Sequence, residues 1–141
     1  MSLTPEQAYD EILAVFKTAW DGTGWIALYE NIAGEVPAAG SLDPWARVQM
    51  RTAFGNQGSL SGALGTQRWD RGGDIIVQIF IPLGEGLSRA KQLVKIVLDA
   101  YEGVTTSGGA WFRNARENEI GDDGEWHQTN VVIEFTYDEI K

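Results

Sequence analysis

The turn Gly84-Glu85-Gly86 is the one place in this sequence that has the composition of a phosphate-binding loop. It follows a strand-like apolar run at 77–81 and opens a helical pattern, which is the context in which nucleotide loops occur. The dinucleotide motif, however, needs a third glycine or alanine where this chain has Arg89, and Glu85 would set a negative charge against the phosphates. We therefore predict a plain turn into a helix here, and no nucleotide site.

His127 is the only histidine of the chain, so a catalytic dyad built on imidazole would have to use it. The sequence indicates no serine or aspartate partner, and we interpret His127 as a surface or interface residue. The acidic group formed by Asp122-Asp123, Glu119 and Glu125 offers oxygen ligands for a hard cation, but its spacing is not that of an EF-hand loop. We predict a turn at this group, no metal site and no catalytic residue.

The six tryptophans could form a ligand-stacking site, but we expect most of them in the core. Trp69 is different because it lies between Arg68 and Arg71 in a glycine-rich stretch, and an aromatic ring flanked by arginines has the composition of an interface hot spot. The alternative is that Trp69 simply begins the following strand early. The sequence does not separate these two interpretations.

Charge is distributed unevenly along the chain. Residues 1–43 hold one lysine against seven acidic residues, residues 44–116 hold nine basic against five acidic residues, and residues 117–141 hold one lysine against eight acidic residues. The predicted subunit-interface residues belong to the basic middle part and are Arg47, Arg51, Arg68, Trp69, Arg71, Arg113 and Arg116. They could attract the acidic part of an identical neighbour in a head-to-tail contact that closes into a ring. Equally, the acidic ends could pair with the basic strands of their own fold.

The overall composition is that of one folded domain spanning residues 1–141. A net charge of -9 argues against binding nucleic acid, which requires clustered basic residues. The absence of cysteine removes disulfides, thiolate nucleophiles and cysteine-ligated zinc. No leader-like or membrane-spanning run is present, so we expect a soluble, unexported protein without a membrane partner.

Periodicity predicts two helices and five strands. Thr4 can cap a first helix that has Pro5 in its first turn and Gln7 in a capping box, and that ends at Gly22. The second helix is expected at 87–101, strands at 25–29, 45–54, 75–81, 111–120 and 126–137, and loops at 31–44 and 55–73. The predicted fold is α+β, with a mainly antiparallel sheet of four to five strands and two helices packed on one face. The link from strand 75–81 to strand 111–120 should be a right-handed crossover if the two strands are parallel.

Three segments of the sequence resemble the tail terminator-like proteins of long-tailed bacteriophages and prophages. These are Val77-Gln78-Ile79-Phe80-Ile81-Pro82-Leu83-Gly84-Glu85-Gly86, the stretch 108–114 (GGAWFRN) and the stretch 126–139 (WHQTNVVIEFTYDE). The likeness extends from about Gly62 to the end of the chain and is thin over the first helix.

This resemblance implies a small α+β structural subunit, not an enzyme, without cofactor. Such subunits form a ring, commonly a homohexamer, that caps the tail tube, ends tail growth and offers the surface for head joining. The implied partners are further copies of the chain, the tail tube protein and a head-completion protein, in the host bacterial cytoplasm during assembly and in the virion tail afterwards. Loops of the family are expected to order on ring closure, which suits a mobile glycine-rich loop at 55–73.

Two other functions remain compatible with the sequence. One is a small-ligand binding or enzymatic α+β domain, which predicts a concave apolar pocket holding a polar residue of shifted ionisation. The other is a protein-binding adaptor outside any phage setting, acting through the same glycine-rich loop.

Overall fold

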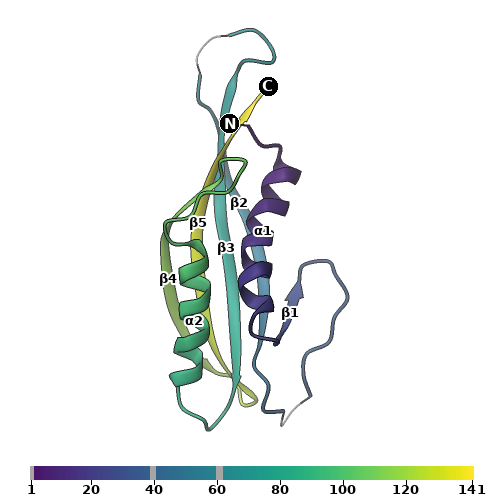
Figure 1. Cartoon of the computed structure of the whole chain (residues 1–141), viewed down its shortest axis with the longest axis vertical. Helices are drawn as coiled ribbons and strands as arrows, with labels where there is room; N and C mark the ends of the chain where they lie inside the picture. The colour runs from purple at the N-terminus through teal and green to yellow at the C-terminus, as the bar shows by residue number, and fades with distance from the viewer. Residues whose placement is uncertain (1, 39–40, 60–61) are drawn as a thin grey trace.

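Two helices cover one face of a five-stranded sheet in the computed structural model, which describes residues 2–38, 41–59 and 62–141 (Figure 1). In chain order the elements are α1 Pro5–Asp21, β1 Ile26–Tyr29, β2 Trp45–Gln57, β3 Arg68–Pro82, α2 Ser88–Tyr101, β4 Trp111–Asp122 and β5 Trp126–Ile140. The strand order across the sheet is β1-β2-β3-β5-β4, and only the β1–β2 pair is parallel. The predicted α+β fold is confirmed.

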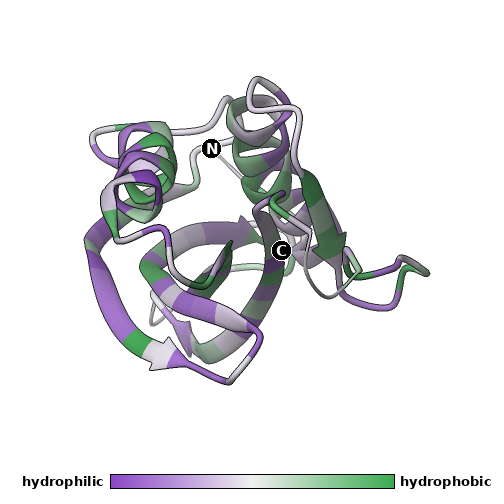
Figure 2. Cartoon of the chain, turned by 90° about the horizontal axis from the view of Figure 1, so that it is seen from below, coloured by the Kyte–Doolittle hydropathy of each residue, from purple (hydrophilic) through white to green (hydrophobic). Residues whose placement is uncertain are grey.

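The core lies between the helices and the sheet face beneath them (Figure 2). Alternate residues of the two central strands point into it: Ile75, Val77, Ile79 and Ile81 from β3, and Val131, Ile133, Phe135 and Tyr137 from β5. The buried Tyr101 hydroxyl donates to the carbonyl oxygen of Ile12 at 2.9 Å and ties α2 to α1. The apolar run at 75–81 therefore lies in β3, the middle strand of the sheet.

The first helix begins as predicted. The backbone N–H of Gln7 donates to the Thr4 hydroxyl at 3.2 Å, and the Thr4 N–H donates back to the Gln7 side chain at 3.0 Å. At the end of α2, Gly103 adopts a φ of 72°, which is the left-handed conformation expected just past a helix. No helix among residues 2–38, 41–59 and 62–141 is long and apolar enough to cross a membrane.

Strands β2 and β3 extend much further than predicted. Their pairing continues to Gln57 opposite Trp69, so the connection covers only residues 58–67, of which 60–61 lie outside the described part. The prediction of a loop over 55–73 was wrong at both ends. The glycines responsible, Gly72 and Gly73, lie inside β3 because neighbouring strands approach their Cα atoms closely: a Cβ on Gly73 would collide with the carbonyl oxygen of Arg51.

Strands β3 and β4 are parallel, because each is antiparallel to β5, which lies between them. The condition for the predicted crossover through α2 is thus met. The two chain ends also meet, since the Leu3 N–H donates to the carbonyl oxygen of Asp138 in β5 at 2.9 Å (Figure 1).

Candidate interaction surface

The sheet has a second face, turned away from the helices, which we call the outer face. Side chains alternate along β2, so that Ala46 and Val48 belong to the core while Trp45 points to the other side. There Trp45 stacks on Phe80 with ring centroids 4.0 Å apart, and Trp126 meets it edge-on at 6.0 Å. This small aromatic cluster is buried and forms a second, separate apolar centre at one end of the outer face.

Strand register brings charges from four strands into one row across the outer face. Arg51 of β2 lies opposite Asp74 of β3, Asp74 lies opposite Glu134 of β5, and Glu134 lies opposite Arg113 of β4. The row therefore reads basic, acidic, acidic, basic. Such a row can bind a partner only if that partner presents charges in register with it.

Four arginines on the outer face are exposed and lack an acidic partner. Within the described residues, no carboxylate lies within 4.0 Å of Arg47, Arg51, Arg113 or Arg116. Arg47 donates to the Gln78 side chain at 2.6 Å, and Arg113 lies 5.1 Å from the ring of Trp111, which is itself 41% exposed. Unpaired guanidinium groups beside an exposed indole have the composition of a protein-binding surface.

Arg68 shares the outer face but is paired locally. Its Nε lies 3.1 Å from Asp70, which in turn lies opposite Asp138 of β5. Burial and then the hydrogen bond and charge of Asp70 raise the pKa of Asp138, while Arg68 lowers it. The carboxyl groups of Asp70 and Asp138 thus lie close together on the outer face, near the guanidinium of Arg68. Five of the seven predicted interface residues, namely Arg47, Arg51, Arg68, Arg113 and Arg116, share this face.

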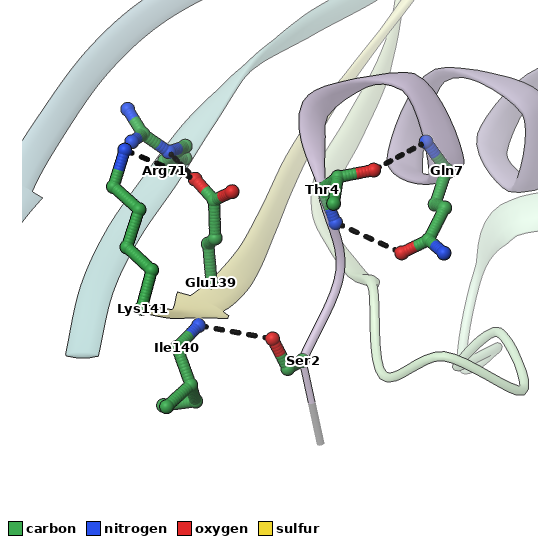
Figure 3. Close-up of polar contacts among 7 residues, drawn as sticks. All are labelled: Ser2, Thr4, Gln7, Arg71, Glu139, Ile140 and Lys141. Atoms are coloured by element: carbon green, nitrogen blue, oxygen red, sulfur yellow. Dashed lines mark hydrogen bonds and ion pairs between the residues drawn. The ribbon is translucent and has the colours of Figure 1, made fainter. Parts of the chain in front are cut away.

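Trp69 and Arg71 lie on the helix-facing side of β3 instead. The Arg71 Nε donates to the buried Glu139 carboxylate at 2.9 Å, and Lys141 Nζ lies 4.0 Å from the same oxygen (Figure 3). Both cations lie over the half-buried Trp69 ring, at 5.9 and 5.7 Å from its centroid. Trp69 does begin the strand early, and for Arg71 the intramolecular alternative holds, since its charge is used within its own fold.

A third set of charges joins α2 to β4. Lys91 donates to Glu117 at 2.6 Å and to Glu119 at 2.8 Å. These hydrogen bonds raise the pKa of Lys91 and lower that of Glu119. The basic middle of the chain is therefore partly neutralised by its own acidic C-terminal part, whereas four arginines of the outer face form no ion pair within the described residues.

The remaining sequence candidates form turns and strand positions. Gly84 and Gly86 have positive φ values of 87° and 78°, and Glu85 accepts a hydrogen bond from Arg89 at 2.7 Å. Asp123 accepts the N–H groups of Trp126 and Glu125, which lower its pKa and close the β4–β5 hairpin.

His127 lies opposite Ile81, half-buried, and its Nδ1 is buried without a partner within the described chain. Across residues 2–38, 41–59 and 62–141, no three histidine or acidic side chains gather in a metal-binding arrangement.

One feature was missed by the sequence interpretation: a groove between α1 and α2 on the helix layer. It consists of two hollows of 820 and 530 Å³ that share Ala19. The first is lined in part by Trp25, Leu93 and Ile96, and the second in part by Val15, Thr18 and Ala100. On α1 the small residues Ala14, Thr18 and Ala19 line it, but α2 has only Ser88 and Ala100 of this kind beside the larger Gln92 and Ile96, so the sequence carries no clear signal for it. We call this feature the helix groove.

The comparisons with known proteins bear on the fold. No protein-family model matches this chain, and no curated protein does. One solved structure, of a protein whose name states no function, is similar to it with a TM-score of 0.63 and 19% sequence identity, over 91% of this chain and 94% of that chain. At 19% sequence identity, this similarity supports a shared α+β architecture and nothing more.

Proposed function

We propose that this chain is a structural assembly subunit that associates with copies of itself into a ring, caps a phage tail tube and so ends tail growth. The proposal needs neither a catalytic residue nor a cofactor. The partners are further subunits, six to a ring by the resemblance given above, together with the tail tube protein below and a head-completion protein above.

The outer face is the observation that carries the proposal. Four exposed arginines lie on a sheet face that no helix covers, and within the described residues none of them forms an ion pair. The same chain carries a net charge of -9, so an identical neighbour is an acidic partner of matching chemistry. Contact between these arginines on one copy and an acidic surface on the next is heterologous, and such contacts close into rings when the rotation between copies permits.

The acidic excess also suits a ring through which DNA passes. An acidic lumen repels phosphate groups and lets the duplex slide without binding. In the proposed ring the arginines lie in the contacts between subunits, and acidic residues line the channel through which DNA passes.

The test is whether the protein limits the length of tail tubes. Purified tube protein polymerises with or without this chain, and electron microscopy gives the length distribution and the fraction of capped ends. We expect shorter tubes with capped ends. The Arg47→Glu, Arg51→Glu double variant should lose this effect, while the charge-retaining Arg47→Lys, Arg51→Lys control should keep most of it. Tubes of unchanged length with bare ends would remove the proposal.

A further inference from the structure

The connection between β1 and β2 begins with residues 31–38, which we call the arm. In Figure 1 this connection leaves the body on the side of β1, away from α2. Its residues 33–38 belong to no helix or strand. Within the described part of the chain, residues 32–37 make no hydrogen bond to another residue. Among the described residues, six backbone carbonyl groups and the five N–H groups of residues 32–36 are thus left without a hydrogen bond, since Pro37 has no N–H to donate.

The arm also exposes apolar side chains. Ile32 is 59% exposed and Val36 is 45% exposed, four positions apart in a segment that belongs to no helix or strand. Side chains of this size contribute about 1.5–3 kcal/mol each when they are buried fully. Exposed apolar anchors on a segment without secondary structure suit binding in a groove.

The helix groove matches the arm in length and in chemistry. Helix α1 has 17 residues and is about 25 Å long, while six extended residues span about 20 Å. The groove is apolar around Ala19, Leu93 and Ile96, and its lining also holds the charged residues Glu11, Glu85 and Arg89. The exposed side chains Thr18 and Gln92 can pair with an extended backbone.

The charge distribution favours binding of the arm in the groove of a second copy of the chain. Helix α1 carries four acidic residues against one lysine. The arm follows the edge strand β1, which pairs with β2, the strand of Arg47 and Arg51. The one charged residue of the arm itself is Glu35, and Arg89 in the groove lining has the opposite charge. An arm from one copy entering the groove of another therefore brings the strand of the unpaired arginines toward an acidic helix.

We infer that the arm of each subunit binds in the helix groove of its neighbour and fixes the order of subunits in the ring. This inference rests on the proposed function and deepens it by naming the contact. The interface is heterologous, with arm and groove on different surfaces of each copy, so every subunit can both give and receive an arm.

Disulfide trapping tests the contact, because the chain has no cysteine of its own. The Val36→Cys, Ala19→Cys double variant, oxidised and run without reductant, should give a ladder of covalent multimers that disappears with reductant. The matched control is Leu64→Cys with Ala19→Cys, which moves the first thiol to a 90% exposed position in the β2–β3 connection and should stay monomeric. No crosslink, or a crosslink within one chain, overturns the inference.

A second measurement guards against misfolding of the cysteine variants. Ile32→Asp with Val36→Asp changes only exposed side chains, and it should weaken self-association at least about tenfold, as measured by light scattering against concentration. Unchanged association, or a wild-type chain that is monomeric throughout, contradicts the arm contact. Rings that still cap tubes without any arm crosslink would overturn this inference and leave the proposed function standing.

Discussion

At the scale of single residues, the basic side chains divide by what they touch. Arg71 pairs with the buried Glu139, Lys91 pairs with two glutamates of β4, and Arg68 pairs with Asp70. Arg47 and Arg51, by contrast, have no acidic partner among the described residues. The paired residues stabilise the monomer, and the unpaired ones are available to a partner. This division leads to opposite expectations for substitution.

Arg71→Ala should lower the free energy of unfolding by about 1–3 kcal/mol, because it leaves the buried Glu139 carboxylate without its hydrogen-bond donor. Arg51→Ala should stay within about 0.5 kcal/mol of wild type, because its side chain is exposed and forms no ion pair within the described chain. Urea denaturation of the monomer measures both. Equal costs for the two variants would mean that the ion pair on β3 and β5 is not made.

Asp138→Asn should stabilise the protein at neutral pH. The pKa of Asp138 is raised in the folded state, so the folded chain favours its protonated form. The associated stability is fully present below about pH 4, the ordinary aspartate value, and is lost as the pH rises through the raised pKa. Asparagine imitates the protonated group and removes repulsion from Asp70, with a gain below about 1 kcal/mol because the site is partly solvated.

Denaturation at pH 7 and at pH 3 separates this effect from a general one. The gain for Asp138→Asn should appear at pH 7 and vanish at pH 3. Asp122→Asn, at an exposed position of β4, removes the same charge and should show no such difference. An equal gain at both pH values would argue against the carboxyl pair as its cause.

At the scale of elements, the β2–β3 pair shows what the sequence could and could not predict. Apolar and polar residues alternate from Ala46 to Val48 in the sequence, and the structure places Ala46 and Val48 in the core and Arg47 on the other side of β2. The prediction failed at 55–73, because glycines that permit close approach between strands have the same sequence signature as glycines in a loop. Local sequence does not record which strands are neighbours, and that information decides between the two.

The same limit applies to the interaction surface. The arginines of β2 and β4 were predicted as one set, but their common face depends on strand register and on the irregularity between Arg113 and Arg116. A shift of one residue in register would move them to the helix side. The helix groove is still harder to predict from the sequence, because it forms where two helices that are far apart in the chain pack together.

Gly73→Ala should destabilise the protein by about 1–3 kcal/mol or more, because its Cβ would overlap the Arg51 backbone at the irregular position in β2. The control is Gly55→Ala, whose Cβ would meet only the movable end of the Arg71 side chain and should cost less. Thermal denaturation followed by circular dichroism compares them. If Gly73 tolerates alanine as well as Gly55 does, the close pairing of β2 and β3 beyond Arg51 is wrong.

At the scale of the whole molecule, the proposal requires a basic surface and an acidic surface on different sides of one subunit. The exposed arginines of β2 and β4 supply the first, with Asp74 and Glu134 between them, and α1 with its exposed Asp10 and Asp21 supplies the second. A charge swap tests this pairing at constant net charge. Arg47→Glu with Arg51→Glu should weaken assembly, and so should Asp10→Lys with Asp21→Lys, because each creates like-charge contacts.

The fourfold variant that combines these changes keeps the net charge of -9 and should recover a large part of the lost association. Sedimentation velocity at matched concentrations measures the recovery, and lowering the salt concentration should enlarge all three effects. A fourfold variant that associates as weakly as either double variant would place the contact elsewhere.

The central claim, that this subunit closes into a ring, is tested most directly by determining the particle mass and imaging the same sample. Mass photometry across a wide concentration range, followed by electron microscopy with and without tail tubes, yields both. We expect one discrete multiple of 15.5 kDa and closed rings that also appear at tube ends. A strict monomer that leaves tube ends bare, or open filaments of indefinite mass, would contradict the account.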